Sequence, residues 1–469
     1  MAGDTVTLGT GRTGGREATT GVIPGRFALS VGMPEITPPT GWKWTPLSSV
    51  AQLESGHTPS RSRPEYWNGG IPWIGIKDAT ANHGRTIYDT YQHVSELGLS
   101  NSSARLLPAN TVCLSRTASV GFVVVMGCPM ATSQDFVNWV CGPNINPHFL
   151  KYVLLIENEA LWRFAHGTTH QTIYFPEAKA FHVCLPPLPE QNAIASVLGT
   201  LDDLIELNRE TNEILEEMAR ALFKSWFVDF DPVRAKLEGR PPAGMDAATA
   251  KLFPNHFQDS ELGEIPRGWK NVTIGDICKI NNWSLGKSDK LDTLEYVEIS
   301  EVNRGNIASI STYLRGSEPS RARRRLRHGD TVLSTVRPDR GAYFLALNPP
   351  ENRVASTGFA VLTPSKTPWS FVHAAMTQPE VFEHLGHLAD GGAYPAVRPE
   401  IISAIEVVIP NSSAILDEFQ QVCAPLFEMA VSNRLESRDL AALRDTLLPK
   451  LLSGEVSVAN IESQLKVKR

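Results

Sequence analysis

Two segments of the chain space their apolar residues alternately by three and four positions, which is the pattern of a helix that packs along one narrow seam. In the first segment the seam positions are Ile194, Val197, Leu201, Leu204, Asn208, Thr211, Leu215, Met218 and Leu222. Each has a counterpart 225 residues later (419 − 194): Phe419, Val422, Leu426, Met429, Asn433, Glu436, Leu440, Leu443 and Leu447. The pattern predicts two long helices in one register, over residues 187–230 and 411–455.

Both seams are polar in the middle, where Asn208 and Asn433 occupy corresponding positions. One interpretation is that each helix lies on its own globular region. We favour an antiparallel coiled coil, because an internal repeat favours a pseudo-two-fold arrangement in which the two copies complement each other. A two-fold axis across the pair would bring Asn208 close to Asn433, where a polar pair fixes the register at some cost in stability.

The regions before each helix are also repeated. "PPTGWKWTPLSSVAQLESG" from Pro38 resembles "IPRGWKNVTIGDICKINNW" from Ile265, and "LLPANTVCLSRTASVG" from Leu106 resembles "RLRHGDTVLSTVRPDRG" from Arg325. The latter pair predicts a Thr-Val strand, a Ser and an Arg-bearing turn that closes with Gly. Each region then ends in a Gly-rich turn, a β run and prolines.

These repeats predict an α+β fold class: two pseudo-repeated α/β domains, separated by two long helices that form an antiparallel coiled coil. The predicted parts are a flexible N-terminal arm over 1–35, a first domain over 36–186, the first helix over 187–230, a connector over 231–264, a second domain over 265–410, the second helix over 411–455 and a tail over 456–469.

Composition excludes some classes of protein. The longest apolar runs fall short of the roughly 18 residues that cross a bilayer, so no membrane partner is expected. The six cysteines are scattered, without zinc-type spacing, which indicates free thiols in a reducing cytoplasm and no metal site. The net charge is −6, but residues 315–340 carry eight arginines against three carboxylates. Such a local field attracts phosphate even in an acidic chain.

Catalytic motifs are missing. "NPPE" at 348–351 has Glu351 where a base-gripping loop would carry an aromatic residue, and "SLGKS" at 284–288 lacks the first glycine of a phosphate loop. The sequence contains neither HExxH nor GxSxG, and it has no spaced carboxylate set of a two-metal nuclease. We therefore expect a non-catalytic chain that binds no cofactor itself.

Two similar but divergent domains on a helical spacer suit a ligand with two different signals at a fixed spacing, such as double-stranded DNA. Base edges are read by Arg, Lys, Asn, Gln, Ser and Thr, and phosphate contacts hold the register. Trp67, Trp73 and Trp283 are interpreted as packing residues. The DNA-binding candidates are Thr58, Ser60, Arg61, Arg63, Lys77, Arg116, Thr168, Thr169, His170 and Gln171 in the first domain, and Lys287, Lys290, Arg321, Arg323, Arg324, Arg325, Arg327, Arg337, Arg340, Tyr394 and Arg398 in the second.

The stretch "LPPLPEQNAIASVLGTLDDLIELNRETNEILEEMARALFKSWFVDFDPVRAK" resembles the central conserved region of specificity subunits of type I restriction-modification systems. The "RPPAGMDAATAKLFP" segment, both Gly-Trp starts and "LRDTLLPKLLSGEV" are similar to the same family. This resemblance covers nearly everything after residue 36.

The resemblance implies two target-recognition domains that each read one part of a bipartite asymmetric site. It also implies helices that set the spacer and dock two methyltransferase (modification) subunits. Those subunits would bring S-adenosylmethionine, and restriction subunits with ATP and Mg would add DNA cleavage as a defence system. The second helix departs from the family pattern, because it lacks the Pro-Glu-Gln start and contains Pro425 and Pro449, which are expected to kink or end it. The alternative function is a two-headed protein-interaction scaffold without sequence-specific DNA binding.

Overall fold

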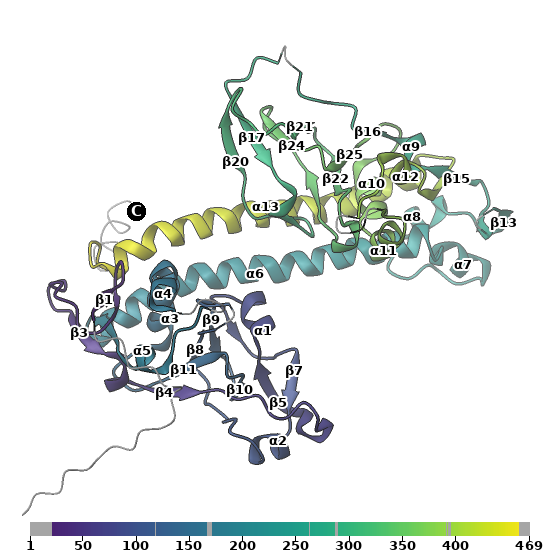
Figure 1. Ribbon diagram of the computed structural model, residues 1–469. Helices are drawn as coiled ribbons and strands as arrows, with labels where there is room; N and C mark the ends of the chain where they lie inside the picture. Colours follow the sequence, from purple (N-terminus) through teal and green to yellow (C-terminus); the bar gives the residue numbers. More distant parts are fainter. Residues whose placement is uncertain are drawn as a thin grey trace, which may run out of the picture. The chain divides into compact units, whose positions relative to one another are not determined.

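The computed structural model describes residues 21–117, 119–166, 171–261, 263–286, 289–390, 392 and 395–458 (Figure 1). Its contacts divide the chain into two compact units. One falls within Met1–Leu204 and Leu440–Arg469, and the other within Ile205–Asp439. Two helices, α6 (Leu188–Phe227) and α13 (Ala414–Leu452), each contribute residues to both units. Within the described residues, no helix combines the length and the hydropathy needed to cross a bilayer.

The globular part of the first unit, here called the first head, has three small sheets with strand orders β4-β11-β8-β9-β6, β1-β2-β12-β3 and β10-β5-β7. Its strands are β1 (Ile23–Pro24), β2 (Leu29–Val31), β3 (Lys43–Pro46), β4 (Ala51–Ser55), β5 (Trp67–Ile74), β6 (Thr86–Ile87), β7 (Gln92–Val94), β8 (Val112–Ser115), β9 (Val123–Met126), β10 (Ala131–Thr132), β11 (Phe136–Cys141) and β12 (Phe181–Leu185). Its helices are α1 (Ile76–Ala81), α2 (Glu96–Ser100), α3 (Pro147–Ile156), α4 (Asn158–Phe164) and α5 (Phe175–Lys179).

The globular part of the second unit, the second head, is built from sheets β16-β25-β22-β23, β15-β26, β20-β17-β24-β21 and the pair β18-β19. Its strands are β15 (Trp269–Thr273), β16 (Cys278–Ile280), β17 (Thr293–Val297), β18 (Val302–Asn303), β19 (Asn306–Ile307), β20 (Ser311–Leu314), β21 (Ala322–Arg325), β22 (Asp330–Ser334), β23 (Tyr343–Ala346), β24 (Arg353–Ser356), β25 (Phe359–Pro364) and β26 (Glu406–Pro410). Its helices are α9 (Ile274–Ile277), α10 (Trp369–Met376), α11 (Pro379–His387) and α12 (Pro399–Ser403).

The two heads share one topology, which confirms the predicted repeat. The order β4-β11-β8-β9 corresponds to β16-β25-β22-β23, and the pair β3-β12 corresponds to β15-β26. The heads also share a parallel pair, with Trp73 opposite Ala131 in the first and Tyr296 opposite Val354 in the second, and the first head has a further parallel pair, β6 with β9. In these sheets β8 and β9, and their counterparts β22 and β23, are buried along their whole length, as hydrophobic runs such as "VVVM" at 123–126 indicate.

The predicted flexible arm over 1–35 is wrong for residues 21–35. Strand β2 lies between β1 and β12, and both Leu29 and Val31 are fully buried. The buried carboxylate of Glu157 accepts backbone N–H groups from four successive residues, Arg26 (2.7 Å), Phe27 (2.6 Å), Ala28 (2.8 Å) and Leu29 (3.3 Å). A long-range acceptor of this kind cannot be read from a segment rich in Gly and Thr. Residues 1–20 and 459–469 lie outside the described part.

The predicted connector is structured in the second unit. It forms α7 (Asp231–Leu237), α8 (Ala247–Leu252) and the hairpin of β13 (Phe257–Ser260) with β14 (Gly263–Pro266). Phe230 and Phe253 belong to the hydrophobic core of this unit, together with Trp269 of the second head. The connector therefore helps to bury the aromatic end of α6.

Both long helices exist close to their predicted bounds, and α13 continues through Pro425 and Pro449. The contacts within each unit make them antiparallel: Asp202 bonds to Arg444 in the first unit, and Asn212 bonds to Asn433 in the second. Half of the predicted seam is shifted by one residue. Leu204, Met218, Met429 and Leu443 are exposed, while the adjacent Ile205, Ala219, Ala430 and Arg444 lie inward.

The shift has a physical cause in side-chain size. Small residues such as Ala219 (0% exposed) and Ala430 (1% exposed) allow the helices and their surroundings to approach closely, so the bulkier neighbours turn outward. Asn212 enters the interface by the same shift. Asn433 therefore donates to Asn212 Oδ1 (2.9 Å) and not to Asn208, whose amide donates to Glu436 Oε2 (3.0 Å). The expected pairing of Asn208 with Asn433 is wrong.

The junction between the first head and the helices is ionic. Asp202 on α6 accepts hydrogen bonds from Lys151 Nζ (2.9 Å) and the Tyr152 hydroxyl (2.6 Å) of α3, and from Arg444 of α13 (2.9 Å). Burial opposes the carboxylate charge, but the charge of Lys151 and these hydrogen bonds together hold the pKa of Asp202 below its usual value. One carboxylate thus joins three helices.

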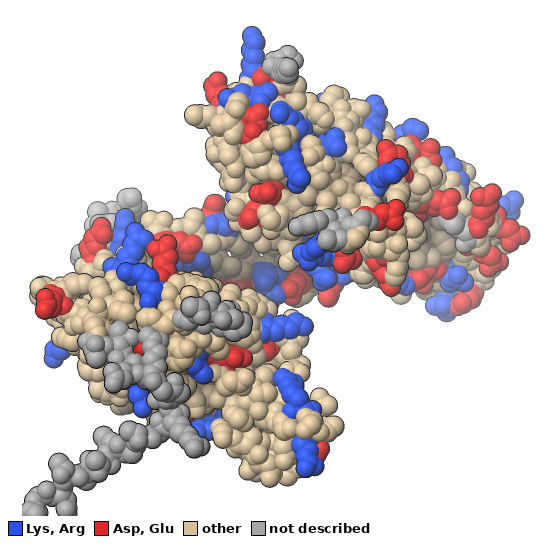
Figure 2. Space-filling view, viewed as in Figure 1, with Lys and Arg blue, Asp and Glu red and all other residues tan. Residues whose placement is uncertain are grey.

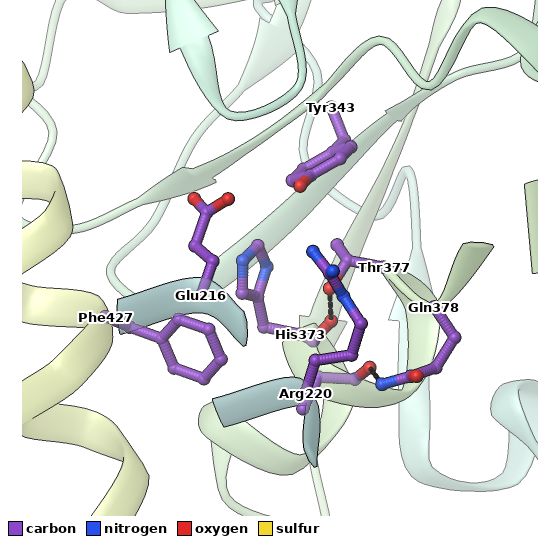
Figure 3. A pocket seen from close by; sticks show the side chains of 8 residues that line it. Glu216, Arg220, Tyr343, His373, Thr377, Gln378 and Phe427 are labelled. Carbon is purple, nitrogen blue, oxygen red and sulfur yellow. Dashed lines mark hydrogen bonds between the residues drawn. The ribbon is translucent and has the colours of Figure 1, made fainter. Parts of the chain in front are cut away.

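The corresponding junction in the second unit is aromatic. An offset of 225 residues places Phe427 where Asp202 stands, and Ala219 where Arg444 stands. Phe427 meets the His373 ring of α10 edge-on at 4.8 Å between centroids. Beside it lies a small pocket, lined by Glu216, Arg220, Tyr343, His373, Ala374, Thr377, Gln378 and Phe427 (Figure 3).

We predict that Asp202→Ala destabilises the first unit by about 3 kcal/mol, because it leaves the buried Lys151 ammonium without its partner. Urea denaturation followed by hydrogen exchange of α3 measures this loss. The matched control is Asp203→Ala, which removes the exposed neighbouring carboxylate and should change stability by less than about 0.5 kcal/mol. Equal effects of the two variants would contradict the ionic junction.

Acid should loosen the second unit through His373. Burial, with a smaller contribution from the charge of Arg434, lowers the pKa of His373 to about 3. Because the folded-state pKa lies below the ordinary value near 6.5, this contribution to stability is complete above about pH 6.5 and is lost as the pH falls toward 3.

Thermal melts of the wild type and of His373→Leu between pH 7 and pH 4 test this. The variant lacks the group that must be protonated, so the melting advantage of the wild type over it should shrink as the pH falls. His387→Asn, which alters an exposed histidine, should follow the wild type at every pH. A constant difference between wild type and His373→Leu would refute the assignment.

Candidate nucleic-acid interface

Arg61 of the first head is held against two indole rings. Its guanidinium carbon lies 3.7 Å from the ring centroid of Trp67 and 5.1 Å from that of Trp73, and its Nη2 donates to Gln92 Oε1 (2.9 Å). Strand β5 places both tryptophans, and Trp73 is fixed by donating its Nε1 hydrogen to the carbonyl of His57 (3.1 Å). An exposed cation held in one direction by stacking is suited to bind phosphate or a base edge.

A second cation–aromatic contact lies at the same small sheet. Lys77 Nζ is 4.0 Å from the ring centroid of Tyr91, which directly precedes Gln92 in β7. Asp78 fixes the Tyr91 backbone by accepting its N–H (2.8 Å). Tyr91 and the nearby Tyr88 are both exposed, at 61% and 70%. The sequence interpretation missed these two tyrosines and Gln92.

Arg116 and Thr58 meet at another residue that the sequence interpretation missed. Arg116 Nε donates to the backbone carbonyl of Gln134 (3.1 Å), and Thr58 Oγ1 donates to Gln134 Oε1 (2.5 Å). The Arg116 guanidinium also lies 5.0 Å from the Phe175 ring, and burial lowers its pKa. Arg116 is therefore half-buried and anchors the turn after β8.

The other candidates of the first head are surface residues. Ser60 contacts Ser62 (2.9 Å between hydroxyl oxygens), and Arg63 forms an ion pair with Glu65 (3.5 Å). Gln171 is exposed. Thr168, Thr169 and His170 lie outside the described residues.

The arginine cluster of the second head is partly neutralised. Arg325 lies 3.4 Å from carboxylate oxygens of both Asp289 and Glu351, and Arg323 lies 3.7 Å from one of Glu318. Figure 2 accordingly shows acidic side chains among the basic ones over the part of this head that Figure 1 labels β17, β20 and β21. The local excess of arginine therefore overstates the charge available to a ligand.

Two arginines of this cluster are distinctive. The guanidinium carbon of Arg327 lies 3.2 Å from the ring centroid of Trp283, which repeats the Arg61–Trp67 contact of the first head. Arg324 is half-buried, burial lowers its pKa, and its Nε has no hydrogen-bond partner within the described part of the chain. Trp67 and Trp283 thus support cations in addition to packing.

The remaining candidates of the second head are dispersed. Lys290, Arg321, Arg340 and Arg398 are exposed, and Arg398 immediately precedes α12. Arg337 adopts a left-handed φ of 46° in the turn after β22. Lys287 and Tyr394 fall outside the residues that the structure describes.

Arg116 and Arg337 do not occupy equivalent positions in the two heads. The carbonyl of Arg116 accepts the N–H of Ile173 (2.8 Å), and in the second head the carbonyl of Thr335 accepts the N–H of Val397 (2.9 Å). Thr335 therefore occupies the place of Arg116, and Arg337 lies two residues later. The two turns differ in conformation, which similar letter patterns do not reveal. Within the described residues, no group of three or more His, Cys, Asp or Glu side chains could hold a metal ion.

Comparisons with known proteins agree on one family. A family model described as the type I restriction modification DNA specificity domain matches residues 39–217. The chain is 26% identical over 432 residues to the specificity subunit of the type I restriction enzyme MjaIX from Methanocaldococcus jannaschii, covering 90% of this chain and 95% of that one. It is 28% identical over 369 residues to the HindI specificity subunit of Haemophilus influenzae, covering 68% and 80%.

A solved structure shares the fold. The S subunit of a type I restriction-modification system from M. genitalium matches with a TM-score of 0.53 at 17% identity, covering 87% of this chain and 96% of that one.

Proposed function

Because the chain belongs to the specificity subunits of type I restriction-modification systems, we propose that it reads a bipartite asymmetric site in double-stranded DNA, one part with each head. The observation that carries this proposal is the repetition of one fold with different exposed residues, in which each head presents an arginine stacked on an indole ring. Two related but unequal readers fit two unequal half-sites.

Within each head the residues take different roles. Arg61 and Arg327 present guanidinium groups whose direction is fixed by Trp67 and Trp283, as reading a guanine edge with two hydrogen bonds requires. Exposed cations such as Lys77 and Arg321 suit phosphate, which holds the register without reading sequence. Arg116 supports Gln134, whose side chain holds Thr58.

The helices would dock two methyltransferase subunits. Bulky apolar side chains lie outside on both helices. The seam shift accounts for Leu204, Met218, Val422, Met429 and Leu443, and Leu207, Ile214 and Leu435 lie outside the predicted seam. Leu204 corresponds to Met429 in the repeat, and Met218 corresponds to Leu443. Equivalent exposed positions suit two copies of one partner.

In this proposal the chain itself catalyses nothing and works in the cytoplasm, where the DNA lies. The methyltransferase subunits would supply S-adenosylmethionine for adenine methylation. Restriction subunits, with ATP and Mg, would add cleavage. The exposed apolar positions would also suit a protein-interaction scaffold without sequence-specific DNA binding, so DNA reading needs its own test.

The direct test maps methylated adenines in the genome of the source cell, with and without a deletion of this chain. A split motif that disappears on deletion supports the proposal and gives both half-sites. Unchanged adenine methylation on deletion would reject it.

We predict that the affinity of the complex for its DNA falls steeply with salt, because released counterions drive phosphate binding. The slope of log affinity against log salt should be about −0.9 for each phosphate neutralised. Fluorescence anisotropy from 50 to 200 mM salt measures it. A scaffold would show neither this slope nor any preference among duplex sequences.

Single substitutions should show which half-site each head reads. Arg61→Ala is expected to relax base preference in one half-site by about 1–3 kcal/mol, and Arg327→Ala in the other. Binding to a duplex library followed by sequencing measures both. Arg240→Ala, at an exposed arginine paired with Glu238 in the connector, is the control and should change neither half. Loss spread evenly over both halves would mean that these arginines contact only phosphate.

A further inference from the structure

A groove of about 570 Å³, its open mouth included, lies between the second head and α13. One wall is a single face of α13, because Val431, Arg434, Leu435 and Arg438 are spaced i, i+3, i+4 and i+7. The opposite wall comes from β19, β23 and the following loop, and it includes Ile307, Phe344, Leu347 and Pro349. The lining is mainly apolar, as it is in many ligand sites.

The groove also carries one uncompensated cation. Arg353 is held by two hydrogen bonds to Glu295 Oε2 (2.9 and 2.7 Å), and Arg434 is paired with Glu216. Arg438 is different: within the described parts of the chain, no carboxylate lies within ion-pair distance of it. The apolar floor of the groove is formed by Phe344, Val431 and Leu435. This floor, beside a single unpaired guanidinium, is complementary to a bulky apolar side chain that lies next to a carboxylate.

A glycine allows the two walls of the groove to approach closely. Gly305 has a φ of +82°, and a Cβ there would meet the guanidinium of Arg434 at 2.6 Å. Glycine therefore lets the loop before β19 lie directly against α13.

The corresponding face of α6 has the opposite character. The repeat places Glu206, Arg209, Glu210 and Glu213 where α13 has Val431, Arg434, Leu435 and Arg438. Arg209 is neutralised within its own helix, because it forms ion pairs with both Glu206 and Glu213. An acidic ligand that fits α13 would be repelled by this face.

We propose that the groove between the second head and α13 binds an acidic segment of a partner protein, once per chain. The segment places a bulky apolar side chain on the floor formed by Phe344, Val431 and Leu435, and a neighbouring carboxylate on Arg438. The site therefore breaks the equivalence of the two partner positions on the helix pair. This inference uses the proposed function only to name the partner as a subunit of the same complex.

The test uses the purified full-length chain and two fluorescein-labelled peptides of equal length, one with the core Asp-Glu-Leu-Phe-Glu and one with the core Lys-Lys-Leu-Phe-Lys. Fluorescence polarisation should show binding of the acidic peptide at least about tenfold tighter than binding of the basic one. Calorimetry should give one acidic peptide per chain. Equal affinities, or two acidic peptides per chain, would overturn the proposal.

Two charge reversals at corresponding positions locate the site. Arg438→Glu should weaken the acidic peptide by about tenfold or more, whereas Arg209→Asp, made on α6, should change its affinity less than about twofold. Leu435→Ser should weaken it as well, since it removes part of the floor. Thermal melts confirm that each variant is folded.

A titration with duplex DNA tests the other possible occupant of the groove, a DNA phosphate. It also keeps the peptide site distinct from the proposed reading of DNA. Arg438→Glu should leave the affinity for duplex DNA unchanged. If it weakens DNA binding and spares the acidic peptide, the groove contacts phosphate and the peptide site is refuted. Because the peptide titration contains no DNA, a failure of DNA reading would leave its result unaffected.

Discussion

The close antiparallel packing of α6 and α13 is the constraint on which the other features depend. Small residues at the inner positions, notably Ala219 and Ala430, allow this packing, and their neighbours Met218 and Met429 turn outward. The same one-residue shift of the seam places Asn212 opposite Asn433. A polar pair therefore lies inside the interface and sets the register. A pair of helices that presented all its large side chains inward would have no apolar surface left for a partner.

The two heads are attached to this helix pair by different chemistry, although their folds correspond. Asp202 joins three helices through charge and hydrogen bonds, whereas Phe427 and His373 form an apolar contact in the corresponding place. An ionic junction depends on exact partners, and an aromatic one depends mainly on volume. The repeat has therefore kept its topology while the chemistry of its contacts has diverged.

Much of the fold could be predicted from sequence, because periodicity and repeated motifs report directly on local structure. The helix bounds, their antiparallel sense and the shared topology of the heads were of this kind. The one-residue seam shift was not, because Leu204 and Ile205 are equally apolar and only the partner helix decides between them. The sequence also did not predict the ordered structure of residues 21–35, because that structure depends on Glu157, which is more than 120 residues away in sequence.

The candidate interface was predictable only by residue type. The sequence proposed Arg61 and Arg327 as candidates by residue type, but it did not reveal the indoles that hold them. Trp67 and Trp283 appear as ordinary packing residues until their contacts are known. Gln134 joins Thr58 to Arg116 through the fold alone. The different conformations of the turns after β8 and β22 likewise depend on backbone geometry, as the left-handed Arg337 shows.

The strand at residues 29–31 makes the two heads differ in which backbone edges are open. In the first head β12 is bonded on both sides, by β2 and β3, and the outermost strand of that sheet, β1, is only two residues long. In the second head, within the residues described, β26 is bonded to β15 alone. Open backbone edges can template the addition of a foreign strand, and β2 pairs the edge of β12 whose counterpart on β26 stays unpaired within the described residues.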